Sequence, residues 1–350
     1  MIKANSLNSL VYQTCEKILK EGTPLHSRNG LCWELLDVDL YLANPKARYL
    51  YLNGRTNNPF ATLFETIWVF AGLDSIQHLE VFIPRAKNYS DDGKTWRGAY
   101  GTRVYNHNQI NSVLEHFLKE GFNTRRAVMT IWQPELDTQE SIRKQGFQSS
   151  KDIPCSQWLG FWIRDNKLYL KFQMRSNDVI FGFSHINVFE FTTLQQIVKE
   201  MIENNSGEKL DLGYYHHSVV SLHLYDFSRK QAESIVGDKE NLQFFLPKRT
   251  LDRLIPPYIY NQKELQIYFR QLYDYIVGEI SYDFNKDLSC EIHIWAELSR
   301  IYFRYKTEGI EKSKFINTVR DFLYRTAKLN EDYEIVRSVE HYLNRISKQE

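Results

Sequence analysis

Four residues in the stretch 154–187 are of types that carry out covalent chemistry on a small molecule: Cys155, Arg175, Asp178 and Asn187. Cys155 follows a proline at the start of a strand-like run, where a thiol can be exposed and a facing arginine can stabilise its thiolate. A lone cysteine among aromatic residues is more often a small buried hydrophobe than a nucleophile. Cys155 is therefore a candidate nucleophile because of the residues that accompany it.

Two predicted strands position these side chains. Residues 157–164 and 167–175 are rich in aromatic and β-favouring residues and flank the turn-forming pair Asp165 and Asn166, which is typical of an antiparallel hairpin. In the second run apolar and polar residues alternate, so one face is predicted to be apolar and Arg175 to lie on the other. The apolar positions are Leu168, Leu170, Phe172 and Met174.

The composition is that of a globular protein. The 350 residues are 43% hydrophobic and 25% charged, with a net charge of +1 and dispersed basic residues, so a single nucleotide is a more natural partner than a long nucleic acid. No apolar run approaches the roughly 20 residues of a membrane span. The four cysteines form no CxxC pair and follow no signal peptide, which indicates a reduced, cytoplasmic setting.

The order and spacing of the candidate residues resemble the thymidylate synthase family. The shared pattern is proline–cysteine, a hairpin, RSxD, a glycine, an asparagine and then a helix. In that family the cysteine attacks carbon 6 of a uracil nucleotide, the arginine–serine pair holds the 5′-phosphate, the aspartate faces the pterin and the asparagine reads the base. The resemblance implies these roles for Cys155, Arg175 with Ser176, Asp178 and Asn187.

The resemblance extends upstream to three further residues. Arg28 lies in the loop PLHSRNG, where an arginine is either solvated or, as in the family, closes on the nucleotide phosphate. Glu65 lies on the flank of an apolar helix predicted over 61–72; such a carboxylate is usually an exposed spacer, but the family uses it for proton transfer at the base. The AYG element implies that Tyr100 lies over the reactive cysteine.

Two further motifs imply a dimer and a sugar-binding pair. NTRRAVMTIWQPELD resembles the family's SRRxxxxxWxxxELD, whose arginine pair reaches the partner subunit's phosphate, so Arg125 and Arg126 imply a homodimer with shared sites. SLHLYDF resembles GDTHLYxNH, whose histidine and tyrosine bind the sugar hydroxyl, which implies this role for His223 and Tyr225; Ser221 replaces the family's aspartate. A strand histidine is otherwise usually a packing residue.

The resemblance implies an α/β (α+β) fold with a central, mostly antiparallel or mixed sheet and flanking helices. It covers about 240 residues and predicts a catalytic domain over 1–248. From about residue 251 apolar positions recur at helical spacing, which predicts a C-terminal helical extension over 249–350.

Three departures from the synthases concern the exclusion of water from the reaction. Where the synthases carry two tryptophans, a gapless count from Gly93 places Arg85 and Asn88. Ser156 replaces the histidine after the cysteine, and the final residues ISKQE show no apolar tail. Because water that reaches the intermediate gives a hydroxymethyl rather than a methyl product, the departures favour hydroxymethylation.

The sequence therefore predicts an enzyme that transfers a one-carbon unit from methylenetetrahydrofolate, a reduced folate, to dUMP through a Cys155 adduct, giving 5-hydroxymethyl-dUMP without a metal. The first alternative is a thymidylate synthase that makes dTMP. The second is an inactive nucleotide-binding interaction protein. If the chain is phage-encoded, the cytoplasm in question is the host's.

Overall fold

The computed structural model describes residues 1–281 and 288–348. Its strands are β1 (Ile2–Ala4), β2 (Thr23–Ser27), β3 (Gly30–Leu42), β4 (Val128–Thr130), β5 (Ser156–Arg164), β6 (Lys167–Asp178) and β7 (Asp211–Tyr225). Its α-helices are α1 (Leu7–Glu21), α2 (Pro59–Phe70), α3 (Leu79–Phe82), α4 (Tyr100–Tyr105), α5 (Gln109–Glu120), α6 (Pro134–Asp137), α7 (Gln139–Lys144), α8 (Val188–Ser206), α9 (Asp226–Gly237), α10 (Gln262–Val277), α11 (Glu291–Thr307), α12 (Lys312–Asp321) and α13 (Glu334–Ser347). Shorter helical segments are η1 (Ala86–Tyr89), η2 (Asn106–Asn108), η3 (Val179–Asn187), η4 (Lys239–Phe244) and η6 (Phe322–Thr326).

The strands in the described residues form one mixed sheet. Its order is β1-β3-β7-β6-β5-β4, with β2 paired to β3. The pairs β1–β3 and β6–β7 are parallel, and the other pairs are antiparallel. The predicted mostly antiparallel or mixed sheet is confirmed.

The β5–β6 hairpin forms as the sequence predicted. Asp165 and Asn166 both have a positive φ, 50° and 55°, which is the conformation that a two-residue hairpin turn requires. The alternating apolar residues of β6 are buried, whereas Arg175 is exposed. β6 also continues to Asp178, three residues beyond the predicted end, because it pairs along that length with β7.

The segment after β6, η3, is a π-helix that leads directly into α8. The sequence has GFSHIN where the family has the shorter GxPFN. A hydrogen-bonded π-helical turn holds one more residue than an α-helical turn, so the inserted residue falls in a segment that has room for it. The buried guanidinium of Arg55 fastens this segment through bonds to Ser184 Oγ (3.0 Å) and the carbonyl of Ile180 (2.7 Å).

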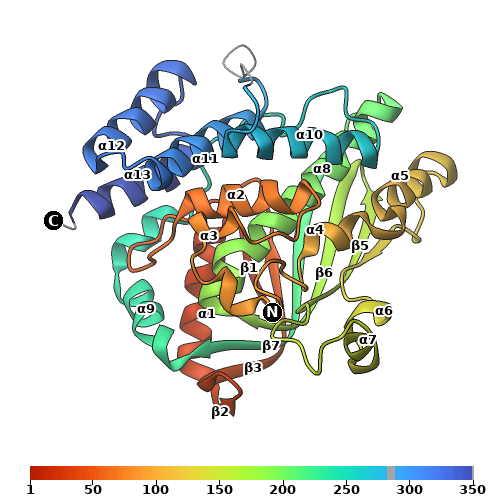
Figure 1. Ribbon diagram of the computed structural model, residues 1–350, viewed down its shortest axis with the longest axis horizontal. Coiled ribbons are helices and arrows are strands. Elements are labelled where there is room, and N and C mark those ends of the chain that lie inside the picture. The colour runs from red at the N-terminus through yellow and green to blue at the C-terminus, as the bar shows by residue number, and fades with distance from the viewer. Residues whose placement is uncertain (282–287, 349–350) are drawn as a thin grey trace.

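Helices α1 and α8 cover one face of the sheet, as Figure 1 shows. On β7 the residues beneath α8, such as Tyr215 and His217, are fully buried. The alternate residues face the other way, where Tyr214 and Val220 are exposed. The uncovered face therefore retains accessible apolar surface.

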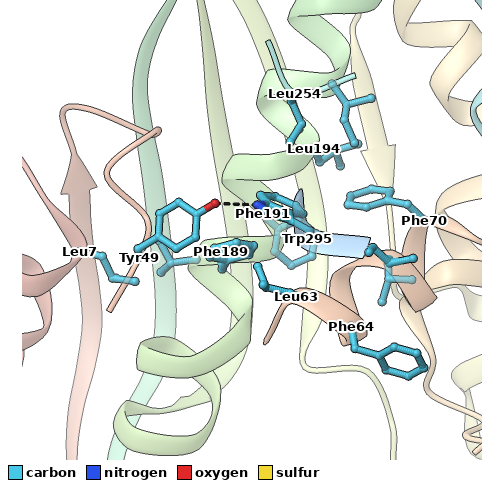
Figure 2. Close-up of a cluster of buried hydrophobic side chains, with 14 of the residues drawn as sticks. Leu7, Tyr49, Leu63, Phe64, Phe70, Phe189, Phe191, Leu194, Leu254 and Trp295 are labelled. Atoms are coloured by element: carbon cyan, nitrogen blue, oxygen red, sulfur yellow. Dashed lines mark hydrogen bonds between the residues drawn. The ribbon is translucent and has the colours of Figure 1, made fainter. Parts of the chain in front are cut away.

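The C-terminal helices lie along one side of the molecule, across α2 (Figure 1). Trp295 of α11 is fully buried among aromatic residues of α8, and its indole N–H donates to the hydroxyl of Tyr49 at 2.7 Å (Figure 2). Helices of the predicted extension thus share a core with the sheet-forming part. The boundary at 248/249 stays a prediction.

The segment predicted as the loop PLHSRNG is instead largely strand. β2 pairs antiparallel with the start of β3, so only Arg28 and Asn29 form the turn between them. The long β3 offers an open edge, and pairing to it satisfies backbone groups that a free loop would leave to water. Within the described residues, we find no helix with the length and apolar character needed to cross a membrane.

Candidate active site

Cys155 lies at the mouth of β5, as predicted, and its side chain is half-buried. Its carbonyl accepts a hydrogen bond from the backbone N–H of Arg175 at 2.9 Å, which pins the cysteine to β6. Burial raises the pKa of the Cys155 thiol above its usual range, against the opposing charges of Arg175 and Arg28. Arg175 acts in the expected direction and lowers the pKa of Cys155, but desolvation is the larger effect and the pKa stays raised.

Arg175 and Arg28 both lie near the cysteine. Arg175 donates to the carbonyls of Pro154 (3.2 Å) and Ile153 (2.7 Å), and Arg28 donates to the carbonyl of Lys151 at 3.4 Å. Both arginines are exposed. Two guanidinium groups at the rim of the same site can bind a phosphate group.

Tyr100 lies at the start of α4, near enough to Cys155 for the two side chains to interact electrostatically. Burial raises the pKa of the Tyr100 hydroxyl well above its usual range, and a charge on the neighbouring Cys155 raises it further. The segment before Tyr100 contacts Asp152, whose carboxylate accepts a hydrogen bond from the indole N–H of Trp96. A Cβ at Gly98 would lie 2.2 Å from that carboxylate, so only glycine allows this approach.

Two buried carboxyl groups, Glu65 of α2 and Glu190 of α8, lie close to each other. Neither side chain forms a hydrogen bond with another described residue. Burial raises the pKa of Glu65 to about 7, although the nearby Arg85 lowers it. Burial, and then the charge of Glu65, raise the pKa of Glu190 well above its usual range. Glu65 can therefore exchange a proton near neutral pH, whereas burial and the charge of Glu65 both favour the protonated form of Glu190.

Arg85 reaches this site and Asn88 does not. The guanidinium of Arg85 lies 4.0 Å from the centre of the Phe181 ring on η3, while Asn88 is exposed. Of the two residues counted into the positions of the family's tryptophans, only Arg85 thus has a place beside Glu65.

Replacing Arg85 with alanine is expected to raise the pKa of Glu65 above about 7, because a cation favours the ionised carboxylate and its removal favours the protonated form. Carbon NMR titration of isotope-labelled glutamate, assigned with Glu65→Gln, measures this pKa. Arg85→Lys should retain part of the effect, and Asn88→Ala should leave the midpoint unchanged. A midpoint that stays in place in Arg85→Ala would contradict this electrostatic assignment.

The predicted sugar-binding pair lies side by side at the end of β7. The rings of His223 and Tyr225 are 4.8 Å apart, and His223 Nδ1 is 3.5 Å from the hydroxyl of Ser176 on β6. The Tyr225 hydroxyl accepts a hydrogen bond from the side chain of Asn29 at 3.1 Å, beside Arg28. Ser221, which pairs with Ser176 across the strands, donates its hydroxyl to Glu34.

Asp178 begins η3, and only one of its two oxygens is used by the protein. Oδ1 accepts the backbone N–H groups of Ile180 and Phe181. Oδ2 is enclosed and forms no hydrogen bond with any described residue. Burial raises the pKa of Asp178 above its usual range, against those backbone N–H groups. The free oxygen can accept a hydrogen bond from the ring nitrogens of a pterin, so the residue fits the expected role.

Asn187 is buried at the end of η3. Its Oδ1 accepts a hydrogen bond from Nδ2 of Asn177 at 2.8 Å, and its own Nδ2 forms no hydrogen bond with the described residues. The predicted base reader therefore has its amide oxygen anchored and its amide nitrogen available to a ligand.

Arg125 and Arg126 are exposed and do not join this group. They precede β4, whose neighbour Ala127 pairs with Phe161 of β5, six residues along the strand from Cys155. That separation is roughly 20 Å, farther than an arginine side chain extends. The guanidinium of Arg126 forms an ion pair with Glu120 of its own chain at 3.3 Å, and its backbone N–H donates to the hydroxyl of Thr124.

The sequence did not single out Glu190, Asn177 or His217. The signal for Asn177 was present, since it occupies the x of RSxD beside two predicted site residues. Glu190 follows Asn187 by three residues, where it reads as an ordinary helix residue. Its proximity to Glu65 depends on the packing of α8 on α2, which no local pattern reveals.

Comparison with known sequences identifies the family to which this fold and site belong. The family profile described as thymidylate synthase matches residues 11–254. The match covers more than half of the chain, and the chain belongs to the thymidylate synthase family. The resemblance inferred from the sequence is confirmed.

Three similar proteins within this family are named as nucleotide hydroxymethyltransferases. The chain is 36% identical over 243 residues to deoxyuridylate hydroxymethyltransferase of Delftia phage PhiW-14, covering 69% of the chain and 66% of that protein. It is 30% identical over 233 residues to the enzyme of the same name from Bacillus phage SP01, covering 62% of the chain and 57% of the relative. Deoxycytidylate 5-hydroxymethyltransferase of Enterobacteria phage T4 is 30% identical over 103 residues, 29% of the chain and 40% of the relative. The matched region thus spans less than two thirds of each of these relatives.

Proposed function

We propose that the protein transfers a one-carbon unit to carbon 5 of dUMP and adds water, giving 5-hydroxymethyl-dUMP. The observation that carries this proposal is a connected group in which Tyr100 neighbours Cys155 and Glu190, and Glu190 neighbours Glu65, a buried carboxyl group whose pKa of about 7 suits proton transfer at neutral pH. The relatives named deoxyuridylate hydroxymethyltransferase support the same reaction.

Cys155 would act as the nucleophile. Carbon 5 of uracil is a poor nucleophile, and addition of the Cys155 thiolate to carbon 6 turns it into an enolate carbon that can take up a one-carbon unit. Arg175, Arg28 and Ser176 would hold the phosphate, His223 and Tyr225 the sugar, and Asn187 the base. Loss of the proton from carbon 5 and release of the thiolate complete the exchange of hydrogen for the new group.

Methylenetetrahydrofolate would supply the one-carbon unit. The free Oδ2 of Asp178 is the observation that favours such a co-substrate, because it leaves a buried acceptor for a nitrogen-rich ring. In our proposal Asp178 binds and orients that ring.

The surroundings of Glu65 favour water rather than its exclusion. Glu65 and Glu190 have no partner among the described residues, and Arg85 adds a cation beside them. Polar groups of this kind can form hydrogen bonds with an ordered water molecule, which a hydrophobic wall would exclude. Glu65 can accept the proton of that water as it adds to the new carbon.

The release of label from dUMP tritiated at carbon 5 tests the one-carbon transfer. We expect release that requires both methylenetetrahydrofolate and Cys155, since the proton leaves only after the thiol has added and the new bond has formed. Release without the folate would point to simple exchange. No release and no folate binding, with nucleotide binding retained, would favour the inactive binding protein.

The proposal includes a homodimer in which Arg125 and Arg126 serve the partner's site. Two observations support it: the arginines are too far from Cys155 of their own chain, and the uncovered sheet face exposes Tyr214 and Val220. A second copy packed on this face would bury that apolar surface. The four free cysteines support a reducing cytoplasm as its setting.

Mixing the two inactive variants Cys155→Ala and Arg126→Ala should restore activity. A hybrid dimer contains one site with a native cysteine and a native partner arginine, so equal mixing should give about a quarter of the wild-type rate. Subunit exchange is checked with two affinity tags, and Lys119→Ala in place of Arg126→Ala serves as a surface control that is active by itself. Confirmed exchange without recovered activity would contradict shared sites.

A further inference from the structure

A chain of four buried side chains leads from the β-sheet to the proposed base reader. The Tyr215 hydroxyl lies 2.8 Å from His217 Nδ1, and His217 Nε2 lies 3.0 Å from Asn177 Oδ1. Asn177 Nδ2 in turn donates to Asn187 Oδ1 at 2.8 Å. All four residues are at most 5% exposed. The chain joins β7, β6 and the end of η3, so it couples the sheet to the site.

The chemistry of the groups fixes the direction of every hydrogen bond in this chain. Asn177 uses its amide nitrogen toward Asn187, so its oxygen faces His217 and the proton must lie on His217 Nε2. Burial lowers the pKa of His217 to about 3, which keeps the imidazole neutral. His217 Nδ1 is then an acceptor, and the Tyr215 hydroxyl donates to it. Each group in the chain is satisfied in this direction.

The opposite direction would leave a buried hydrogen without an acceptor. If the Asn187 amide turned over, Asn177 and the tautomer of His217 would have to reverse with it, and the Tyr215 hydroxyl would become an acceptor. Tyr215 is fully buried and makes no other hydrogen bond with the described residues, so its own hydrogen would be unpaired. A buried unpaired donor disfavours that state by roughly one to two orders of magnitude.

Close packing also restricts the pair. An added Cβ at Gly182 would lie 2.3 Å from Asn177 Nδ2 and 2.8 Å from Asn187 Oδ1. The backbone of η3 at Gly182 thus packs closely against both side-chain amides, at the atoms that form their hydrogen bond. This contact resists rotation of either amide.

The orientation of the Asn187 amide matters because uracil and cytosine present opposite patterns. Uracil offers an acceptor at carbon 4 and an N–H donor at nitrogen 3, whereas cytosine offers a donor and an acceptor at the same places. An amide with a free Nδ2 and a remaining lone pair on Oδ1 complements uracil, and the reversed amide complements cytosine. A site that must leave its polar groups unpaired against the wrong base rejects that base strongly.

We propose that Asn177, His217 and Tyr215 hold the Asn187 amide in the orientation that selects uracil, which makes Asn177 a specificity-determining positioning residue that touches no substrate. The inference rests on the proposed function, in which Asn187 reads the base. It adds that side chains of the sheet behind Asn187 set the choice between uracil and cytosine.

The decisive variant is Asn177→Asp, which is nearly isosteric. A carboxylate accepts from His217 Nε2 as before but cannot donate to Asn187 Oδ1, so the Asn187 amide should turn over and donate its Nδ2 to the carboxylate. Calorimetry at pH 8 with dUMP and dCMP measures the ratio of the two affinities. We expect this ratio to shift toward dCMP by roughly 10- to 100-fold, with a gain in dCMP affinity that a merely loosened site would not show.

Two further variants serve as controls. Asn177→Leu removes both hydrogen bonds without imposing a direction, so it should weaken the preference without reversing it. Tyr215→Phe removes the anchor of the chain and should raise dCMP affinity by roughly tenfold, because reversal no longer leaves a hydroxyl hydrogen unpaired. Deoxyribose 5-phosphate, which lacks a base, should bind equally to all variants. Thermal unfolding shows which variants are folded, and Tyr215→Phe carries the test if Asn177→Asp is not.

The outcomes separate this inference from the proposed function. If the folded variants keep the wild-type preference for dUMP, or lose both nucleotides equally, the positioning role is wrong while the proposed function stands. If the wild type prefers dCMP, the assigned orientation does not select uracil and the inference is overturned. If the wild type binds neither nucleotide, the proposed function fails and the inference fails with it.

Discussion

Cys155→Ala is expected to lower turnover of dUMP by roughly a thousandfold or more while leaving the affinity for dUMP within a small factor of wild type. The thiol makes a bond only during the reaction, whereas the contacts proposed for phosphate, sugar and base come from other residues. Single-turnover kinetics and calorimetry measure the two quantities separately. A variant that turns over normally would remove Cys155 from the mechanism.

Two controls sharpen this test. Cys32→Ser changes a free cysteine that is buried on β3 and lies outside the proposed chemistry, so it should retain activity. Because burial raises the pKa of the Cys155 thiol, iodoacetamide should alkylate it slowly at neutral pH and faster as the pH rises. Rapid alkylation at neutral pH would mean that the arginines outweigh burial after all.

Glu65→Gln is expected to lower the rate by roughly 100- to 10,000-fold, the usual contribution of a general acid–base group. Glutamine keeps the size and polarity of the side chain but cannot take up a proton. In the wild type, a base with a pKa of about 7 should give a rate that rises as the pH increases through 7, and this limb should vanish in the variant. The pH profiles of kcat and kcat/KM measure both effects.

Glu190→Gln is the matched comparison for Glu65→Gln. Both carboxyl groups are buried and lie near each other, but burial and the charge of Glu65 favour the neutral form of Glu190, so a neutral amide of the same shape should cost far less activity. Equal losses in the two variants would show that packing, and not proton transfer, explains the effect of Glu65→Gln.

Local patterns predicted the elements that carry the site. The alternation in β6 and the Asp165–Asn166 turn were sufficient for the hairpin, because strand pairing and turn type depend on neighbouring residues. The sequence predicted that Arg175 lowers the pKa of Cys155, and it does, but it did not predict that burial would raise this pKa by more. The pKa of Cys155 depends on desolvation by segments remote in sequence, including the one that carries Tyr100, and no spacing reveals how closely they pack.

Long-range contacts explain the other differences. Asn177 and His217 are 40 residues apart and are not opposite each other on the parallel strands β6 and β7, where Asn177 pairs with Leu222 and His217 with Phe172, so no local pattern reveals their contact. The inserted residue before Asn187 was visible in the sequence, but its accommodation in a π-helix, fastened by Arg55, required the structure. The roles of the site residues stay predictions, and the variants above test them.

The identity of the product tests the central claim most directly. With dUMP, methylenetetrahydrofolate and water labelled with heavy oxygen, we expect mass spectrometry to find 5-hydroxymethyl-dUMP that carries the label in its new hydroxyl group, together with tetrahydrofolate and no accumulation of dihydrofolate. The label enters because water, activated beside Glu65 and Arg85, completes the reaction, and no hydride leaves the folate. Thymidylate and dihydrofolate formed in equal amounts, with no label in the nucleotide, would contradict the claim and identify the protein as a thymidylate synthase.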